Sequence, residues 1–308
     1  FGYNSNATGA NSVCLGLGSY AAGSNSVSIG QFTKAYGSST AFGSNTLASG
    51  FHSTALGINT IASGNESIAM GANNTASGSN SFAAGNLNVS SGIHSVSMGS
   101  GSIASGDNSF ASGAANSAKS YCSFVVGHFN DNTLSGSPSL MQPLNRLFEI
   151  GNGTTDIARR NALTVLQNGN IGIGELIPTS PLNFASTLGD KIALWGNGAN
   201  HYGLGIQASL MQVYTMDAGN DIAFGYGSSS AFTENVRIKG NGNVGIGTVN
   251  PVVPLNFSTN LGDKIALWSN GTNHYGLGLQ PSLLQLYTEA SSSDIAFGYG
   301  NSAAFTEN

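Results

Sequence analysis

Hydrophobic and polar positions alternate within short stretches of the first 127 residues, and the stretches repeat about every 14 residues. Each begins at a serine and runs bulky, small, bulky, glycine, as in Ser67-Ile68-Ala69-Met70-Gly71. Alternation with a period of two predicts a β-strand that carries its bulky side chains on one face and its small ones on the other. The opening serines are Ser12, Ser26, Ser39, Ser53, Ser67, Ser81, Ser95, Ser109 and Ser123.

Glycine falls at almost every seventh position between Gly2 and Gly113, which gives two glycine-containing turns in each repeat. Only the step from Ser26 to Ser39 is one residue short, and the missing residue lies in a turn. Glycine, asparagine and serine at this density disfavour a helix, and the flanking charges of a coiled coil are absent. The pattern predicts an all-β fold: a solenoid of 14-residue coils, each with two strands of about four residues. About nine coils give a rod section of about 43 Å.

Bulky apolar side chains form a column along this predicted solenoid. Its members include Val13, Leu15, Val27, Ile29, Ile68, Met70, Val96, Met98, Phe124 and Val126. A coil this thin encloses one face of its strand and leaves the other outside. Because a continuous exposed apolar stripe is unfavourable on a soluble monomer, we expect identical chains to cover the outer column around an axis.

Residues 7 to 127 resemble the head repeats of trimeric autotransporter adhesins of the YadA-like kind. The segments Ser67-Ile68-Ala69-Met70-Gly71 and Ala62-Ser63-Gly64-Asn65-Glu66-Ser67 carry the resemblance, and their pattern recurs about nine times in one register. The resemblance implies a left-handed parallel β-roll with three chains side by side, a homotrimer. It also implies display outside the cell, where the fibre attaches to a target-cell surface or a glycan receptor.

A second repeat occupies the rest of the chain. Residues 168–235 and 241–308 align without a gap at an offset of 73, with about two-thirds of the positions identical. The chain begins and stops inside a repeat, so we expect a segment of a longer fibre. The predicted units are a head at 1–127, a junction at 128–167, and two β modules at 168–240 and 241–308.

β-rich runs separated by Gly, Asn and Ser predict the strands of the first module and of the junction. In the first module, four runs predict one small antiparallel unit: 191–195, 202–206, 210–214 and 221–226. In the junction, 147–153 and 163–166 are predicted strands. The modules resemble repeats in large surface or tail-fibre-like proteins of Bacteroidota and their phages.

Composition fits an extracellular structural role. Only 7% of the residues are charged and the net charge is −5, which leaves no electrostatic footprint for nucleic acid. No apolar run is long enough to span a membrane. The apolar content of 40%, in a repeat of fixed phase, predicts a packed structure rather than disorder.

Residues with catalytic or metal-binding chemistry form no convincing site. The run Gly169-x-x-Gly172-x-Gly174 differs from the dinucleotide-binding order. His201 with Asp221 recurs as His274 with Asp294, but neither pair has a third ligand or a nucleophile at a suitable spacing. We therefore expect structural hydrogen bonds there, no catalytic, cofactor or metal site, and no enzyme activity.

The two cysteines are too far apart to pair within one chain. Cys14 and Cys122 are separated by 108 residues, about 37 Å along the predicted stack. Cys14 occupies the small column, so a buried thiol is expected there. An interchain bond at Cys122 is the less favoured alternative.

Two aromatic pairs recur at the module offset, Trp195 with Tyr202 and Trp268 with Tyr275. Repeated aromatic residues in a repeated module usually form its core, and core packing is the favoured interpretation. Stacking on a sugar is the alternative, because a repeated weak glycan site would gain avidity.

Three functions remain open. The favoured one is an adhesive or spacer fibre outside the cell, a homo-oligomeric rod that holds a binding tip away from its base. The second is a tail fibre of a phage or a contractile injection system. The third is a monomeric solenoid that binds ice or another crystal, which would need a regular outward Ser or Thr array. A serine column exists, although Ala22 and Tyr36 interrupt its start: Ser49, Ser63, Ser77, Ser91 and Ser105.

Overall fold

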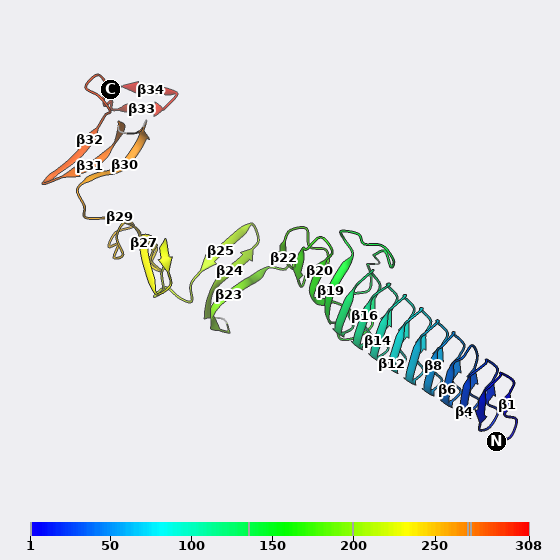
Figure 1. The fold of residues 1–308 in the computed structure, drawn as a ribbon. Coiled ribbons are helices and arrows are strands. Elements are labelled where there is room, and N and C mark those ends of the chain that lie inside the picture. The colour runs from blue at the N-terminus through cyan, green and yellow to red at the C-terminus, as the bar shows by residue number, and fades with distance from the viewer. Residues whose placement is uncertain (1, 135, 199, 270, 272, 308) are drawn as a thin grey trace. The chain divides into compact units, whose positions relative to one another are not determined.

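The computed structural model describes residues 2–134, 136–198, 200–269, 271 and 273–307. Within these ranges every regular element is a β-strand, and the strand order is shown in Figure 1. The chain divides into two compact units, residues 1–187 and 188–308. The all-β prediction is confirmed.

The first unit contains the predicted solenoid, built from two parallel sheets that the chain visits alternately. The two-residue strands form a nine-stranded sheet: β1 (Asn6–Ala7), β3 (Tyr20–Ala21), β5 (Lys34–Ala35), β7 (Leu47–Ala48), β9 (Ile61–Ala62), β11 (Thr75–Ala76), β13 (Val89–Ser90), β15 (Ile103–Ala104) and β17 (Ser117–Ala118). The longer strands begin a thirteen-stranded sheet: β2 (Val13–Leu15), β4 (Val27–Gln31), β6 (Thr40–Ser44), β8 (Thr54–Ile58), β10 (Ile68–Ala72), β12 (Phe82–Asn86), β14 (Val96–Ser100), β16 (Phe110–Ala114) and β18 (Phe124–His128).

Strand lengths differ from the expected two runs of about four residues. A complete coil has one strand of five residues and one of two, for example β10 and β11. Residues in the left-handed conformation set the limits of the strands. Asn73 follows the long strand β10 directly, and Asn80 lies shortly before the next long strand, β12. Neighbouring coils pair in register at the 14-residue offset, with Ile68 beside Phe82 and Met70 beside Ala84.

Small side chains fill the interior of the coils. Long strands contribute Ala41, Ala55, Ala69, Ala83 and Ala111, and short strands contribute Ala35, Ala48, Ala62, Ala76, Ala104 and Ala118, all completely buried. At one level of the core, serine replaces alanine in both the short and the long strand. The hydroxyl oxygens of Ser90 and Ser97 lie 2.6 Å apart there and form a hydrogen bond. The small column is therefore the core of each chain, and the bulky column lies outside, as predicted.

A buried polar column ties successive coils together beside the alanine core. The Asn88 side chain accepts a hydrogen bond from the backbone N–H of Ser102 at 2.8 Å. Its amide nitrogen donates to the carbonyls of Ala84 at 2.9 Å and Gly99 at 2.8 Å. One side chain thus satisfies backbone groups of its own coil and of the next.

Close stacking explains one glycine column. At Gly57, where φ is +120°, an added Cβ would lie 1.9 Å from the carbonyl oxygen of Gly71 in the next coil. No side chain fits there without separating the coils. Gly101 differs, because an added Cβ would come no closer than 3.9 Å to Ala115.

The sheet of long strands continues past the repeats through β19 (Arg146–Asn152), β20 (Asn161–Leu166), β21 (Ile171–Ile173) and β22 (Leu182–Phe184). β18 pairs with β19 in parallel, β20 is antiparallel to both β19 and β21, and β21 pairs with β22 in parallel. Strands are therefore present in both junction runs that the sequence indicated.

The second unit consists of four small sheets. Two have three antiparallel strands each: β23 (Gly189–Asn197), β24 (Asn200–Gln207) and β25 (Leu210–Tyr214), and β30 (Gly262–Ser269), β31 (His274–Gln280) and β32 (Leu283–Tyr287). One has four strands, β26 (Ile222–Ser228), β27 (Ala231–Ile238), β28 (Val244–Ile246) and β29 (Leu255–Phe257), and the last pairs β33 (Gly298–Asn301) with β34 (Ala304–Glu307).

Sheet boundaries differ from the predicted antiparallel unit of four strands. The first three predicted strands do form one antiparallel sheet, but β26 belongs to the four-stranded sheet. That sheet extends beyond residue 240, because β27 pairs with β28. The 73-residue period shows which strands of the two modules are equivalent. It does not show which strands hydrogen-bond to one another within a sheet. The predicted domain limits remain a prediction.

Candidate functional site

The outer face of the thirteen-stranded sheet carries two unbroken rows of side chains. Strand pairing and alternation place the first row at Val13, Val27, Thr40, Thr54, Ile68, Phe82, Val96, Phe110, Phe124, Phe148, Val165, Ile171 and Leu182. The second row is Leu15, Ile29, Phe42, Leu56, Met70, Ala84, Met98, Ser112, Val126, Ile150, Leu163, Ile173 and Phe184. We call these rows the outer apolar face.

The outer apolar face is open to solvent in the single chain. Met70 is 38% exposed and Phe42 is 52% exposed. No position in either row is charged, and only Thr40, Thr54 and Ser112 are polar. Exposed apolar surface of this extent is typical of sites of association.

The face continues beyond the solenoid repeats without a break. Phe110, Phe124 and Phe148 stack in sequence, with ring centroids 4.7 Å and then 5.7 Å apart. Phe148 belongs to β19, which enters the sheet after a connection of 17 residues between His128 and Arg146. The outer apolar face is therefore a property of the whole sheet, and it persists where the repeat pattern has ended.

The sheet of short strands offers no comparable surface. Its row of positions opposite the alanine core is mixed: Asn6, Tyr20, Lys34, Leu47, Ile61, Thr75, Val89, Ile103 and Ser117. One row that includes a lysine, two hydroxyl residues and a tyrosine is a poor apolar interface. The two sides of the solenoid are thus chemically distinct.

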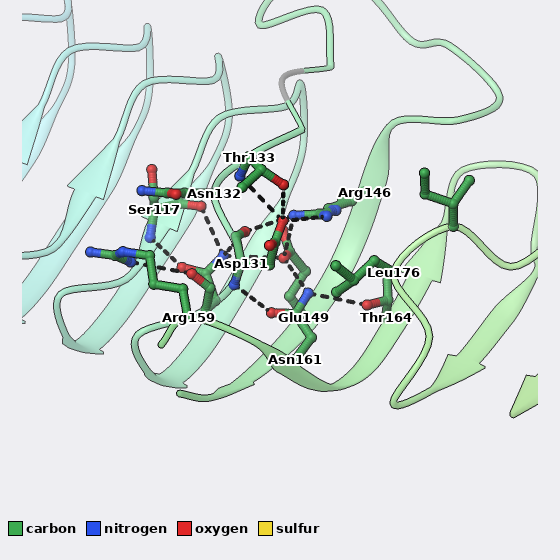
Figure 2. A network of polar contacts seen from close by, with 12 residues as sticks. Ser117, Asp131, Asn132, Thr133, Arg146, Glu149, Arg159, Asn161, Thr164 and Leu176 are labelled. Atoms are coloured by element: carbon green, nitrogen blue, oxygen red, sulfur yellow. Dashed lines mark hydrogen bonds and ion pairs between the residues drawn. The ribbon is translucent and has the colours of Figure 1, made fainter. Parts of the chain in front are cut away.

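A polar network covers the inner core where the repeats end, as Figure 2 shows. The alanine column passes through Val125 to Glu149 and then Thr164. The Arg146 guanidinium donates to the Asp131 carboxylate at 2.8 Å and to the Glu149 carboxylate at 3.2 Å. Asn130 and Asn161 also donate to Glu149, at 3.1 Å and 2.6 Å.

This polar network is nearly inaccessible to solvent, with side-chain exposures of 5% for Arg146 and 3% for Glu149. Burial raises the pKa of Glu149 even though Arg146 and the two asparagines favour its ionised form. The pKa of Asp131 lies below its ordinary value. Burial alone would raise this pKa, but the hydrogen bonds from Arg146 and Thr133 outweigh the effect of burial. Breaking such a buried group by removing one partner is costly, so we interpret the network as a structural cap rather than a reaction site.

The predicted aromatic pairs do form across neighbouring strands. Trp195 pairs with Tyr202 and Trp268 with Tyr275, with ring centroids 5.6 Å and 5.7 Å apart. Trp195 is 65% exposed and lines a shallow hollow of about 420 Å³ with Gly196, Asn200 and Met216.

Neither aromatic pair is buried as a core within the single chain. Trp268 is 49% exposed, and both tyrosines are partly exposed. The pairs are thus available either to a ligand or to another chain, and glycan contact remains a prediction.

His201 and Asp221 both form structural hydrogen bonds, as expected, but with different partners and not with each other. His201, which is 7% exposed, lies 3.2 Å from the Asp190 carboxylate and 2.7 Å from the Tyr214 hydroxyl. Asp221 instead pairs with Arg237 at 2.9 Å. Two bulges in the β23–β24 pairing bring Asp190 beside this histidine, which a sequence period could not reveal.

The second module repeats the same arrangement of histidine and aspartate. His274 lies 2.9 Å from the Asp263 carboxylate, at the positions equivalent to His201 and Asp190. In the first module Tyr214 donates to Asp190 at 2.8 Å, and burial, with help from that carboxylate, raises the pKa of Tyr214. These are structural hydrogen bonds on one face of each sheet.

The cysteines, metal-binding clusters and membrane-spanning helices remain to be compared with the sequence analysis. Cys14 is half-buried with its sulfur 3.1 Å from the Ser19 hydroxyl, and neither Cys14 nor Cys122 forms a disulfide. Among the residues that the structure describes, no cluster of three His, Cys, Asp or Glu is placed to hold a metal. In the same part of the chain, no helix has the length and hydrophobicity to cross a membrane.

Sequence reasoning missed two parts of this surface. It found the outer column within the solenoid but did not extend it over β19 to β22. The sequence did carry a signal, because apolar residues alternate at Phe148 and Ile150 and again at Leu163 and Val165. The strand register was needed, however, to show that these residues continue the outer column. Sequence reasoning also missed the buried Arg146 network, whose members come from the connection after β18 and from β19 and β20, outside the 14-residue repeats.

Comparison with known families gives a result for the solenoid. The YadA head domain repeat matches residues 1–19, 7–33, 37–60, 48–74, 62–88 and 90–116. The matched ranges lie within the region of stacked coils and stop short of β18. No curated protein matches the chain.

Proposed function

We propose that this chain is a segment of an extracellular fibre, a homotrimeric rod that serves in attachment to a cell or another surface. The observation that carries the proposal is the outer apolar face, which runs over thirteen strands without a charged residue. The match to the YadA head domain repeat supports an adhesin-like structural role rather than catalysis.

A second copy of the chain fits this face better than an unrelated partner does. Rows on a parallel stack have the strand spacing of about 4.8 Å, and an identical stack has the same spacing along its whole length. Uncharged rows also meet their own copies without repulsion between like charges. Rotation around one axis would bury every copy's rows equally and close the assembly.

Attachment follows from the rod rather than from a reactive site. Backbone hydrogen bonds stack the coils, and the Arg146 network covers the end of the inner core. Both features suit a long and stiff rod. We propose a target-cell surface or its glycans as the partner of the fibre. No feature of the structure favours the injection-machine or crystal-binding alternatives over this role.

A charge placed in the face tests the proposal directly. Met70→Asp puts a carboxylate in the second row, where association would have to desolvate one in every copy. Ser63→Asp adds the same charge in a neighbouring exposed turn and serves as the matched control. Sedimentation velocity should show a single-chain mass for Met70→Asp and an unchanged assembly for Ser63→Asp. An assembly that tolerates both variants would refute the outer apolar face as the interface.

A further inference from the structure

Each three-stranded sheet of the second unit has one mainly apolar side. In the first of them, pairing and alternation place these residues on the same side: Ile192, Trp195, Tyr202, Leu204, Ile206, Met211 and Val213. The opposite side carries Asp190, His201, Gln212 and Tyr214 together with small residues, and Gln207 and Leu210 at its end. The sheet is therefore two-sided: Asp190, His201 and Tyr214 contact one another on one side, and the other side is mainly apolar.

The same division recurs in the second module. The apolar side of that sheet is Ile265, Trp268, Tyr275, Leu277, Leu279, Leu284 and Leu286. Three aliphatic positions differ in residue type from the first module, and all of them stay apolar. Asp263, His274, Gln285 and Tyr287 occupy the polar side, as in the first module.

The four-stranded sheet repeats part of the outer apolar face of the solenoid. Its apolar side includes Val236 and Ile238, Val244 and Ile246, and Leu255 and Phe257. At the offset of 73 these match Leu163 and Val165, Ile171 and Ile173, and Leu182 and Phe184. Those six residues end the two rows of the thirteen-stranded sheet, so the association surface itself is repeated in the second unit.

The exposure of these sides shows that the single chain leaves them open. Trp195 is 65% exposed, and Met211 and Leu284 are exposed as well. A sheet that is apolar on one side is stabilised by packing that side against another layer. These sheets are therefore expected to gain stability from a covering layer.

We infer that the apolar sides of the second-unit sheets are covered by the same sides of other copies of this chain, so that self-association continues through residues 188–308. The inference rests on the proposed assembly of the solenoid and extends it. A second copy is the occupant because the apolar side of the four-stranded sheet repeats the end of the rows by which the solenoid is proposed to associate, and the three-stranded sheets flank that sheet along the chain. Trp195, Tyr202, Trp268 and Tyr275 then form the core between chains, and they are not a platform for sugars.

The two tryptophans of the chain report on this arrangement, since both lie on the apolar sides. We would measure acrylamide quenching of tryptophan emission and native mass on the same sample of the full 308-residue chain. The expected result is a trimeric mass with both tryptophans shielded from acrylamide. Met211→Asp combined with Leu284→Asp should abolish the shielding and leave the mass unchanged, because the solenoid still holds the copies together.

The matched control places the same charges one residue along, on the polar side. Gln212→Asp combined with Gln285→Asp should leave both the mass and the shielding as they are in the unmodified chain. Loss of shielding in this control as well would overturn the inference, because the effect would then not depend on the apolar side.

Other outcomes separate the two proposals. A trimeric mass with quenchable tryptophans would overturn the inference and leave the solenoid assembly intact. If chitotriose then protected the tryptophans, glycan contact would take its place. Shielding that persisted in a monomeric Met70→Asp chain would assign the cover to the same chain and also overturn the inference. A monomeric mass for the unmodified chain would refute the proposed function itself.

Discussion

The solenoid and the sheets of the second unit solve the same packing problem in different ways. Each coil of the solenoid buries an alanine column inside its own chain, and its backbone groups bond to the coils above and below. The later sheets have one apolar side each and no inner column of that kind. The difference teaches that the solenoid carries part of its stability within one chain, whereas the later sheets depend on what covers them.

Separating the coils should have the largest effect on this comparison. Gly57→Ala places a Cβ against the carbonyl of Gly71, so the solenoid should lose about 4 kcal/mol of unfolding free energy. Gly101→Asn is the matched control, because Leu87 and Ala115 already adopt the left-handed conformation at the equivalent positions. Urea unfolding should show a change of less than about 1 kcal/mol for the control. Equal losses in both variants would mean that conformation, and not stacking distance, makes Gly57 necessary.

Dissociation should sharpen the contrast between the units. In the monomeric Met70→Asp chain, amides of β24 and β31 should exchange with solvent about 100-fold faster than those of β12, because sheets without a core open at little cost. Hydrogen exchange followed by mass spectrometry resolves the two regions. Equal protection in both would contradict the view that the second-unit sheets need a cover.

Removing a polar link between coils should cost less. Asn88→Ala leaves the Ser102 N–H and the carbonyls of Ala84 and Gly99 without this partner, at a cost of about 2 kcal/mol. Asn88→Thr should cost less, because Thr33, Thr46 and Thr60 occupy the same column in other coils. Ser91→Ala removes an exposed side chain from the same coil and should change stability by less than about 0.5 kcal/mol. Thermal unfolding ranks the three variants, and a reversed order would refute the role given to Asn88.

The smallest effect concerns pH. Since burial raises the pKa of Glu149, the folded chain holds that proton more tightly than the unfolded chain does. Stability from this group is therefore present below the usual glutamate pKa of about 4.3 and is lost as pH rises through the raised value. Glu149→Gln should remove this loss, so the variant gains stability relative to the unmodified chain as pH rises through that window.

Glu234 supplies a control of opposite sign for the pH measurement. Hydrogen bonds from Arg237 lower the pKa of Glu234, so its contribution is present above the usual glutamate value and is lost as pH falls. Glu234→Gln should therefore lose stability relative to the unmodified chain as pH rises through the lowered value. Urea midpoints measured between about pH 3 and pH 7 would show the two trends, and parallel trends would contradict the assigned shifts.

Much of the solenoid could be predicted because its determinants are local. Ile68, Ala69 and Met70 alternate within one strand, and the 14-residue period fixes which residues stack. The inner alanine column and the outer bulky column follow from these two facts. Uneven strand lengths did not follow, because they depend on where left-handed residues such as Asn73 interrupt the backbone.

The contacts outside the solenoid could not be predicted from the repeat period. Arg146 reaches Asp131 across 15 residues of non-repeating chain. His201 lies beside Asp190 through a register that contains two bulges, whereas the repeat in the sequence had singled out Asp221, which recurs at the same offset. Trp195 and Tyr202 were correctly paired, but only the register showed that five aliphatic residues share their side of the sheet.

Native mass in solution tests the central claim most directly, namely that copies of this chain cover its apolar faces. Light scattering over a dilution series of the unmodified chain should give three times 31.2 kDa, with no single-chain species at micromolar concentration. A stable particle of 31.2 kDa across the series would contradict the account, because the outer apolar face would then remain exposed to water.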